Sequence, residues 1–164
     1  MTSSKYTTTS TMVRRDDRLF LVDPAWTVAE LDSIVAWAAA ESLRVTSAFA
    51  THAHHDHMLW HPELGDAPRW TTARSAQLAV EWRAELTAQL DDDYPSEWAH
   101  PFDGLRALES VAIPEPFGSD AAHEAIELVE HNGHAPGHAA VWLRERGVLL
   151  AGDMLSDIEL PLPF

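Results

Sequence analysis

Two short runs of alternating apolar and polar residues lie near the start of the chain. Thr11–Arg15 and Arg18–Val22 flank the polar pair Asp16-Asp17, and this pattern predicts two strands joined as a hairpin. The residues ahead of them, 1–10, are rich in Ser and Thr. We expect these first ten residues to form a flexible segment that precedes the folded domain.

Two longer stretches show the spacing of amphipathic helices. Thr27 and Glu30 form the pattern of a capping box, which predicts the start of the first helix, and that helix is expected to end near Ser42. A second helix is predicted from about Ala73 to Leu90. The residues expected to face the core are Leu31, Ile34, Val35 and Ala38 in the first helix, and Leu78, Trp82, Leu86 and Leu90 in the second.

Further apolar runs predict strands, and they bracket one long irregular stretch at residues 94–125. Such a stretch inside a compact domain is often a functional loop. Its aromatic and histidine side chains either line a pocket or pack as a satellite core; they are Trp98, His100, Phe102 and Phe117. The predicted strands are Val45–Ala50, Arg69–Thr72, Ile126–Glu130, Ala139–Arg144 and Val148–Ala151. Strands on both sides of two helices predict a mixed α/β (α+β) layered domain.

The composition narrows the class of protein. The 164 residues correspond to about one domain, which we place at residues 11–164. Eleven Lys and Arg residues against 26 Asp and Glu residues give a net charge of −15, which argues against nucleic acid or an anionic membrane as a partner. The absence of cysteine excludes disulfides, zinc ribbons, iron–sulfur clusters and thiol nucleophiles.

No segment has the features of a signal peptide or the length of a membrane span. We therefore expect a cytoplasmic protein. We also expect it to act on a small molecule, and to form a homo-oligomer or combine with a second chain that completes its functional site.

Histidines provide the candidate chemistry, because four of the ten lie within residues 51–57. Imidazole and carboxylate groups are ligands that zinc and similar divalent ions prefer. His52 and His54 occupy alternate positions after a predicted strand, so both can converge on one ion if the chain is extended or turning there. Asp56 and His57 then point toward a second ion.

Two further elements at the ends of predicted strands support this interpretation. Residues 131–138 contain Gly-His-Ala-Pro-Gly-His, in which glycine and proline shape a turn between two strands. Residues 151–153 read Ala-Gly-Asp and close the last apolar strand with a carboxylate. Side chains from these separate segments can meet at one rim of the domain.

Taken together, these motifs resemble those of the metallo-β-lactamase-fold hydrolase superfamily. The resemblance rests on the His-x-His-x-Asp-His run at 52–57, the Gly-His-x-Pro-Gly-His element at 133–138 and the Gly-Asp pair at 152–153, in this order. Leu21-Val22-Asp23-Pro24 also resembles the opening strand of the family. The resemblance covers the chain from about residue 11 onward and implies a four-layer αββα sandwich.

The resemblance also implies a site for two divalent metal ions, with Zn²⁺ expected first and Fe or Mn as alternatives. One ion would be held by His52, His54 and His134, the other by Asp56 and His57, with Asp153 bridging the two. His138 would support the site without binding metal. The histidines that match no ligand position are His55, His61, His100, His123 and His131.

The activity implied is hydrolysis of an ester, thioester or lactone by a metal-bound hydroxide, with Asp56 steering the nucleophile as well as binding metal. Asp153 stands where β-lactamases of the family carry a cysteine, which favours the glyoxalase II, lactonase and thioesterase branch. One alternative is a mononuclear-iron dioxygenase of the same fold. Another is an incomplete or fragmentary family member that binds metal without turnover by itself.

Two departures from the family pattern motivate the last alternative. The family usually supplies one more histidine downstream of the Gly-Asp pair, whereas this sequence has no histidine after His138. The second metal position is therefore expected to be empty or incomplete, and the second half of the sandwich to be incomplete in this chain. Met58, Leu59 and Trp60 stand where small glycines usually follow the first motif, so we expect them to reshape or narrow the pocket.

Overall fold

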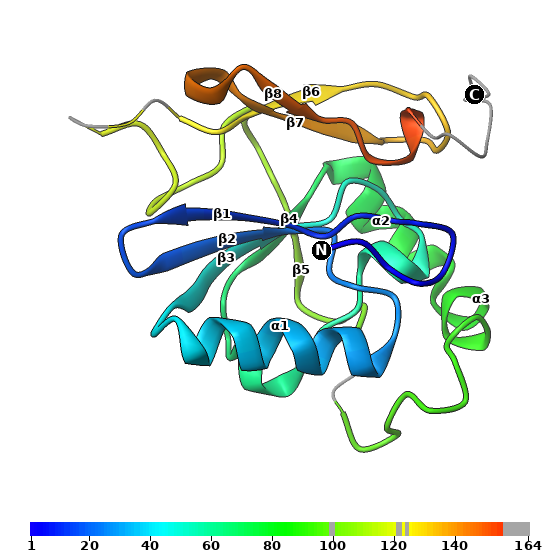
Figure 1. Cartoon of the computed structure of the whole chain (residues 1–164). Helices are drawn as coiled ribbons and strands as arrows, with labels where there is room; N and C mark the ends of the chain where they lie inside the picture. The colour runs from blue at the N-terminus through cyan, green and yellow to red at the C-terminus, as the bar shows by residue number, and fades with distance from the viewer. Residues whose placement is uncertain (99–100, 121–122, 124, 156–164) are drawn as a thin grey trace.

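Two β-sheets lie face to face, and helices lie against the outer side of the first sheet (Figure 1). This computed structural model describes residues 1–98, 101–120, 123 and 125–155. The layered mixed α/β architecture expected from the sequence is confirmed. Both predicted strands of the opening hairpin are present with the expected bounds.

The first sheet has five strands in the order of the chain. β1 pairs with β2 in antiparallel fashion, and the remaining neighbours pair in parallel. Because β2, β3, β4 and β5 run parallel to one another, their carboxyl ends lie at the same edge of the sheet. The strands are β1 (Thr11–Arg15), β2 (Arg18–Val22), β3 (Arg44–Phe49), β4 (Arg69–Thr71) and β5 (Leu105–Ala107).

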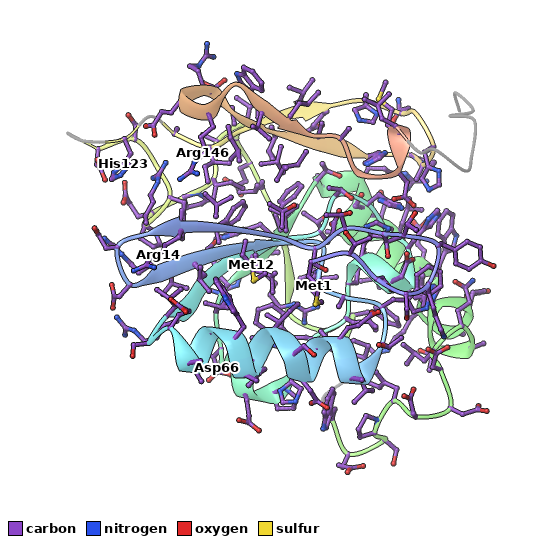
Figure 2. All side chains as sticks on the ribbon, in the orientation of Figure 1. Met1, Met12, Arg14, Asp66, His123 and Arg146 are labelled. Atoms are coloured by element: carbon purple, nitrogen blue, oxygen red, sulfur yellow. The ribbon has the colours of Figure 1, made fainter. Side chains whose placement is uncertain are left out.

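The second sheet is an antiparallel meander of β6 (Glu127–Glu130), β7 (Ala139–Leu143) and β8 (Val148–Leu150). Buried side chains of both sheets fill the space between them (Figure 2). Among the described residues no helix covers the outer face of this sheet, where Val129 and Leu149 are about half exposed. The inter-sheet core includes Val13, Phe20, Val22, Phe49, Leu128, Val141 and Leu143.

Helix α1 (Val28–Ala40) covers the outer face of the first sheet and begins at the predicted capping box. The Thr27 side chain accepts a hydrogen bond from the Glu30 backbone N–H, and the Glu30 carboxylate accepts one from the Thr27 N–H. Both bonds satisfy donors that the first helical turn leaves free. The predicted core residues Leu31, Ile34 and Ala38 are buried, and Val35 packs against them.

The second predicted helix is divided in two, which corrects the expectation of one helix over residues 73–90. α2 (Ala73–Glu81) and α3 (Arg83–Ala88) meet at Trp82, whose backbone departs from helical geometry with ψ near 17°. Leu78 and Leu86 are buried as expected. Trp82, which was expected to face the core, lies at the junction of the two helices and is 38% exposed.

The irregular stretch contains a strand that the sequence does not predict. β5 has only three residues, two of them exposed, and pairs with β4 alone at the sheet edge, so it carries little apolar pattern. Phe102 and Phe117 are buried in the core, and Trp98 packs partly against it. These three side chains are therefore core rather than pocket lining, and His100 lies outside the described residues.

The first ten residues fold back toward α1. Thr2 and Thr9 form an isolated antiparallel β-bridge. The hydroxyl of Ser3 and the backbone N–H of Ser4 donate hydrogen bonds to the Glu30 carboxylate. Whether this segment is flexible stays a prediction. In the part of the chain that is described, no helix has both the length and the apolar character needed to cross a bilayer.

Candidate metal centre

Four turns or short helices meet at one edge of the two sheets. The 3₁₀ helix η1 (His55–His57) follows β3, and η4 (Gly152–Met154) follows β8. The connection from β6 to β7, residues 131–138, lies beside them, as does the turn after β2. The remaining 3₁₀ helices, η2 (Pro62–Leu64) and η3 (Arg144–Arg146), contribute no residue to this edge.

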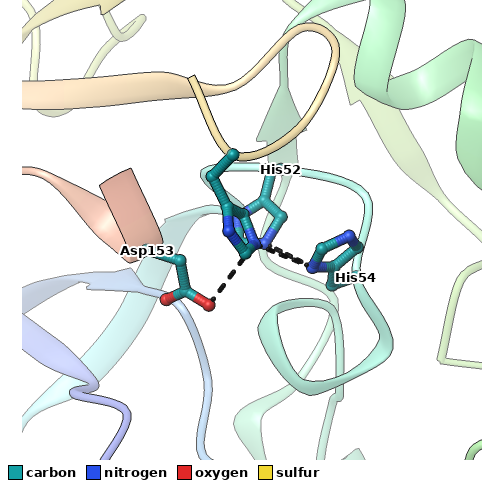
Figure 3. A group of neighbouring side chains, drawn as sticks. His52, His54 and Asp153 are labelled. Carbon is teal, nitrogen blue, oxygen red and sulfur yellow. Dashed lines mark hydrogen bonds and ion pairs between the residues drawn. The ribbon is translucent and has the colours of Figure 1, made fainter. Parts of the chain in front are cut away.

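The first group of potential ligands consists of His52, His54, His134 and Asp153. His52 Nε2 lies 2.9 Å from His54 Nδ1, and His134 Nε2 lies 3.2 Å from the same His54 nitrogen. The Asp153 carboxylate is 3.6 Å from His134 Nε2. Figure 3 shows His52 and His54 with their ring nitrogens turned toward each other, and Asp153 on the other side of His52. One ligand atom from each residue lies within 4.8 Å of the others.

A second group, Asp56, His57 and Asp153, lies directly beside the first. His57 Nε2 is 3.2 Å from the Asp56 carboxylate and 3.4 Å from the Asp153 carboxylate. Asp56 and His57 are buried, whereas the Asp153 side chain is 27% exposed and forms the open side. Asp153 belongs to both groups, so the structure brings together all six residues singled out in the sequence.

Two histidines of the first group, His52 and His54, have pKa values below the ordinary value for an imidazole. Burial, and after it the neighbouring histidines, lowers the pKa of His52 well below its ordinary value. Burial and then His134 lower the pKa of His54 to about 4. Since metal ions bind the neutral imidazole, these two side chains are ready to ligate without losing a proton first.

The second group carries the charge of the site. Burial acts to lower the pKa of His57, but the carboxylates of Asp23 and Asp56 outweigh it and hold that pKa well above the ordinary value. Burial likewise acts to raise the pKa of Asp56, and His57 overrides it, so that the pKa falls to about 2. His57 also lowers the pKa of Asp153 against its burial. Without a metal, the positive charge of a protonated His57 therefore offsets only part of the negative charge of the carboxylates around it.

This donor set fits divalent metal ions. Three imidazole nitrogens lie close to one another. A hydrogen bond between two neutral rings needs one nitrogen to donate a proton and the other to accept it, so three such nitrogens do not all satisfy one another. A cation between them, with the Asp153 carboxylate alongside, satisfies all four groups at once. Nitrogen and carboxylate ligands of this kind suit zinc and iron, so the ligand types leave the identity of the metal open.

Asp23 is a site residue to which the sequence analysis assigned no role. Its carboxylate accepts hydrogen bonds from the Thr51 backbone N–H at 2.7 Å and the Thr51 hydroxyl at 2.8 Å, and it lies 3.1 Å from His57 Nδ1. Thr51 Oγ1 is in turn 3.0 Å from His52 Nδ1. The available signal was an aspartate that ends the fully apolar strand Leu19–Val22.

His138 is completely buried behind His52, with the two ring centroids 4.6 Å apart. Its Nδ1 lies 2.9 Å from the Gly133 carbonyl oxygen. Gly152 allows this packing, because a Cβ there would lie 2.3 Å from His138 Nε2, and its φ of +56° is a backbone conformation that favours glycine. His138 is in neither ligand group, in agreement with a supporting position.

Four described histidines that match no ligand position are also outside both groups. His55 packs edge-on against Trp26, His131 packs against His138, and His61 and His123 lie beside surface aspartates. Met58 and Leu59 are buried in the core, and their effect on the shape of the pocket stays a prediction. Trp60 donates its indole N–H to the Gly65 carbonyl.

Several solved structures share this fold. BLEG-1, a B3 metallo-beta-lactamase, has a TM-score of 0.66 and 18% identity over 93% of this chain and 70% of its own. TTHA1623, in a di-iron-bound form, has a TM-score of 0.65 and 21% identity over 94% and 71%. TTHA1429 from Thermus thermophilus, a metallo-beta-lactamase family protein, has a TM-score of 0.62 and 26% identity over 92% and 55%.

Fold and candidate site thus define a protein of the metallo-β-lactamase fold class. The family model of the metallo-beta-lactamase superfamily matches residues 5–163, and the chain belongs to this superfamily. No curated protein sequence matches the chain. The chain spans 55% to 71% of the length of the three similar structures.

Proposed function

We propose that this protein is a metal-dependent hydrolase that cleaves an ester, thioester or lactone bond of a small molecule. His52, His54 and His134 would hold one divalent ion, and Asp56 with His57 would hold a second. Asp153 would bridge the two ions. Membership of the superfamily supports a metallohydrolase-type enzyme, and the shape of the donor set supports the assignment of ligands.

The observation that carries the proposal is the position of Asp153 between the two groups. Its Oδ2 atom lies 3.4 Å from His57 Nε2 and 3.6 Å from His134 Nε2. A single carboxylate at bonding reach of both groups is what a bridging ligand requires. The position after β8 also leaves it partly exposed, so a substrate can approach from that side.

Bound divalent ions would supply Lewis acidity and lower the pKa of a coordinated water to about 7. The residues of this chain would then position that water and accept a hydrogen bond from it. The Asp56 carboxylate, ionised because His57 lowers its pKa to about 2, can orient a nucleophilic water and accept a hydrogen bond from it. Asp23 would hold His57 in one orientation through their 3.1 Å contact.

The bond cleaved is inferred from the ligand set. A carboxylate at Asp153, in place of the cysteine that β-lactamases of the family carry, supports an ester, thioester or lactone substrate. The metal is open: TTHA1623 is similar in fold and is described in a di-iron-bound form, whereas FIM-1 from Pseudomonas aeruginosa, also similar, is in a mono-zinc form. Zinc remains our first expectation, and a mononuclear-iron dioxygenase of this fold remains the alternative within enzymes.

The test is hydrolysis by the chain reconstituted separately with Zn²⁺, Mn²⁺ and Fe²⁺, using an ester, a thioester and a lactone as substrates. We expect turnover with at least one metal and substrate, reduced at least a hundredfold in Asp56→Asn. Asp32→Asn, which alters an exposed aspartate beside His61, is the matched control and should keep full activity. Oxygen consumption by the iron form without hydrolysis would favour the dioxygenase instead.

A second candidate is metal binding without turnover by this chain alone. It is favoured by the difference between the groups, because the first offers four ligands and the second only three, one of them shared. Tight retention of one ion, with no hydrolysis above that of the free metal for any substrate, would support this candidate. The same result would refute the hydrolase assignment for the isolated chain.

A further inference from the structure

A polar hollow lies at the end of the inter-sheet seam that is opposite the candidate metal centre. It has a volume of about 50 Å³ and is bordered by β1 on one side and by the end of β7 with η3 on the other. In Figure 2, Arg146 and His123 lie at this end, near the turn of the β1–β2 hairpin. The strand β7 separates it from the metal centre, since residues 138 to 143 span roughly 15 Å.

The border of this hollow is unusually basic for such an acidic chain. Four of the ten arginines border it, Arg14, Arg15, Arg144 and Arg146, although the net charge of the protein is −15. A solvated surface would be expected to distribute its few cations among the many acids. Concentration of these cations around one hollow is therefore a feature that needs a reason.

The arginines are held to different degrees. Arg15 is only 8% exposed, donates to the Gly118 carbonyl at 2.9 Å and stacks its guanidinium 5.4 Å from the centre of the Phe117 ring. Arg144 forms an ion pair with Glu127 at 2.8 Å. Arg146 is exposed, and among the described residues no acid pairs with it. The hollow thus combines a fixed cation with one that is free to turn toward a ligand.

The surroundings favour an anion over other ligands. Part of the lining is apolar, from the buried side chains of Val13, Ile126 and Leu143, and a low local dielectric strengthens any charge pair beside them. Among the described residues, one acid, Glu145, also borders the hollow and limits the net positive charge there. The volume is enough for about four water-sized groups, which matches a single small oxyanion rather than a large ligand.

We propose that this hollow is a binding site for a small oxyanion of the phosphate or carboxylate type, bound by Arg15, Arg144 and Arg146. Planar guanidinium groups suit such anions because their forked N–H donors match two oxygens at once. The site is separate from the metal centre and does not depend on the proposed hydrolase activity. Its ligand is either a free anion or the anionic group of a metabolite.

The test is a calorimetric titration of the metal-free chain with inorganic phosphate, and in a parallel arm with citrate, at constant ionic strength. We expect saturable binding of at least one of the two. Arg146→Gln and Arg144→Gln should each weaken it about tenfold or more, as loss of a charge-assisted hydrogen bond predicts. Preference for phosphate or for citrate identifies the class of anion.

Arg83→Gln is the matched control, since it removes the same charge from an exposed arginine that pairs with Asp103 and does not border the hollow. It should leave the affinity unchanged. Side-chain Nε–H signals of the arginines, followed by nuclear magnetic resonance in the same titration, locate the ligand. Equal weakening by Arg83→Gln, or small non-saturating shifts of all arginine signals, would overturn the proposal.

Discussion

The Asp23 carboxylate lies 3.1 Å from Nδ1 of His57, and both side chains are buried. This contact fixes the ring so that Nε2 faces the carboxylates of Asp56 and Asp153. A carboxylate behind a histidine ligand orients the ring and raises its basicity. We therefore infer that Asp23 acts as a positioning residue of the candidate metal centre, although it is in neither ligand group.

We expect Asp23→Asn to weaken metal binding at the Asp56–His57–Asp153 group by about 10- to 100-fold. An amide has no charge to hold the ring. It also replaces one carboxylate oxygen by an N–H₂ group, so one of the two Thr51 donors loses its acceptor. Competition titration with a chromophoric chelator measures the loss. Binding at the first group should change little, and Asp32→Asn should change neither; equal weakening at both groups would contradict a role through His57.

Gly152 is expected to tolerate no side chain. A Cβ would lie 2.3 Å from His138 Nε2 and 2.9 Å from Thr51 Oγ1 at a φ of +56°. Gly152→Ala should lower the free energy of unfolding by about 2–4 kcal/mol, the combined effect of overpacking and a left-handed backbone. Gly147→Ala is the control, because its φ is similar and no atom lies within 4 Å of the added Cβ. It should cost about 1 kcal/mol, and chemical denaturation distinguishes the two.

The stability of the metal-free chain should fall as the pH falls from about 6.5 to 4. Burial, the largest cause in both cases, lowers the pKa of His54 and of His138 to about 4. The unfolded chain takes up these protons near pH 6.5 and the folded chain does not, so acid favours unfolding. His57 contributes no slope in this window, because its raised pKa leaves it protonated in both states below about pH 6.5.

Urea denaturation at about pH 7 and pH 4.5 measures this slope. His54→Gln removes one of the titrating groups, so the loss of stability on acidification should be smaller by about 1–3 kcal/mol. His123→Gln, at an exposed position beside Asp120, should leave the slope as it is. An unchanged slope in His54→Gln would show that burial does not hold that ring neutral.

The capping box should contribute to stability without affecting the site. Thr27→Ala removes the acceptor for the Glu30 N–H and is expected to cost about 1 kcal/mol. Ser33→Ala, within α1, removes only a hydroxyl that donates to the Ala29 carbonyl on an exposed face, and it should cost little. Thermal unfolding compares the two variants, and metal content should be the same in both. A stability loss in Ser33→Ala as large as in Thr27→Ala would contradict the capping role.

The elements with local signals could be predicted from the sequence. The hairpin of β1 and β2 and the cap of α1 depend on neighbouring residues, and both are present as expected. β5 and the change of direction at Trp82 depend on contacts between distant segments. An exposed three-residue edge strand leaves no alternating pattern to detect.

In the candidate site, too, residues with a local sequence signal could be predicted, whereas residues placed by contacts between distant segments could not. His52 and His54 were predictable because so dense a run of metal-ligand residue types is rare by chance, and the order of the later motifs added His134 and Asp153. Asp23 was not assigned a role, because its place beside Thr51 and His57 arises from pairing of β2 with β3, 28 residues apart in sequence for the Thr51 bond. The core positions of Met58 and Leu59 depend in the same way on the path of the chain after η1.

In the proposed site Asp153 joins two metal positions, and equilibrium dialysis of Asp153→Ala against Zn²⁺ tests this role most directly. The native chain should bind up to two ions, and the variant should lose affinity at both positions, with Asp120→Ala behaving as the native chain. Loss at only one position, or full retention of two ions by Asp153→Ala, would contradict the shared carboxylate.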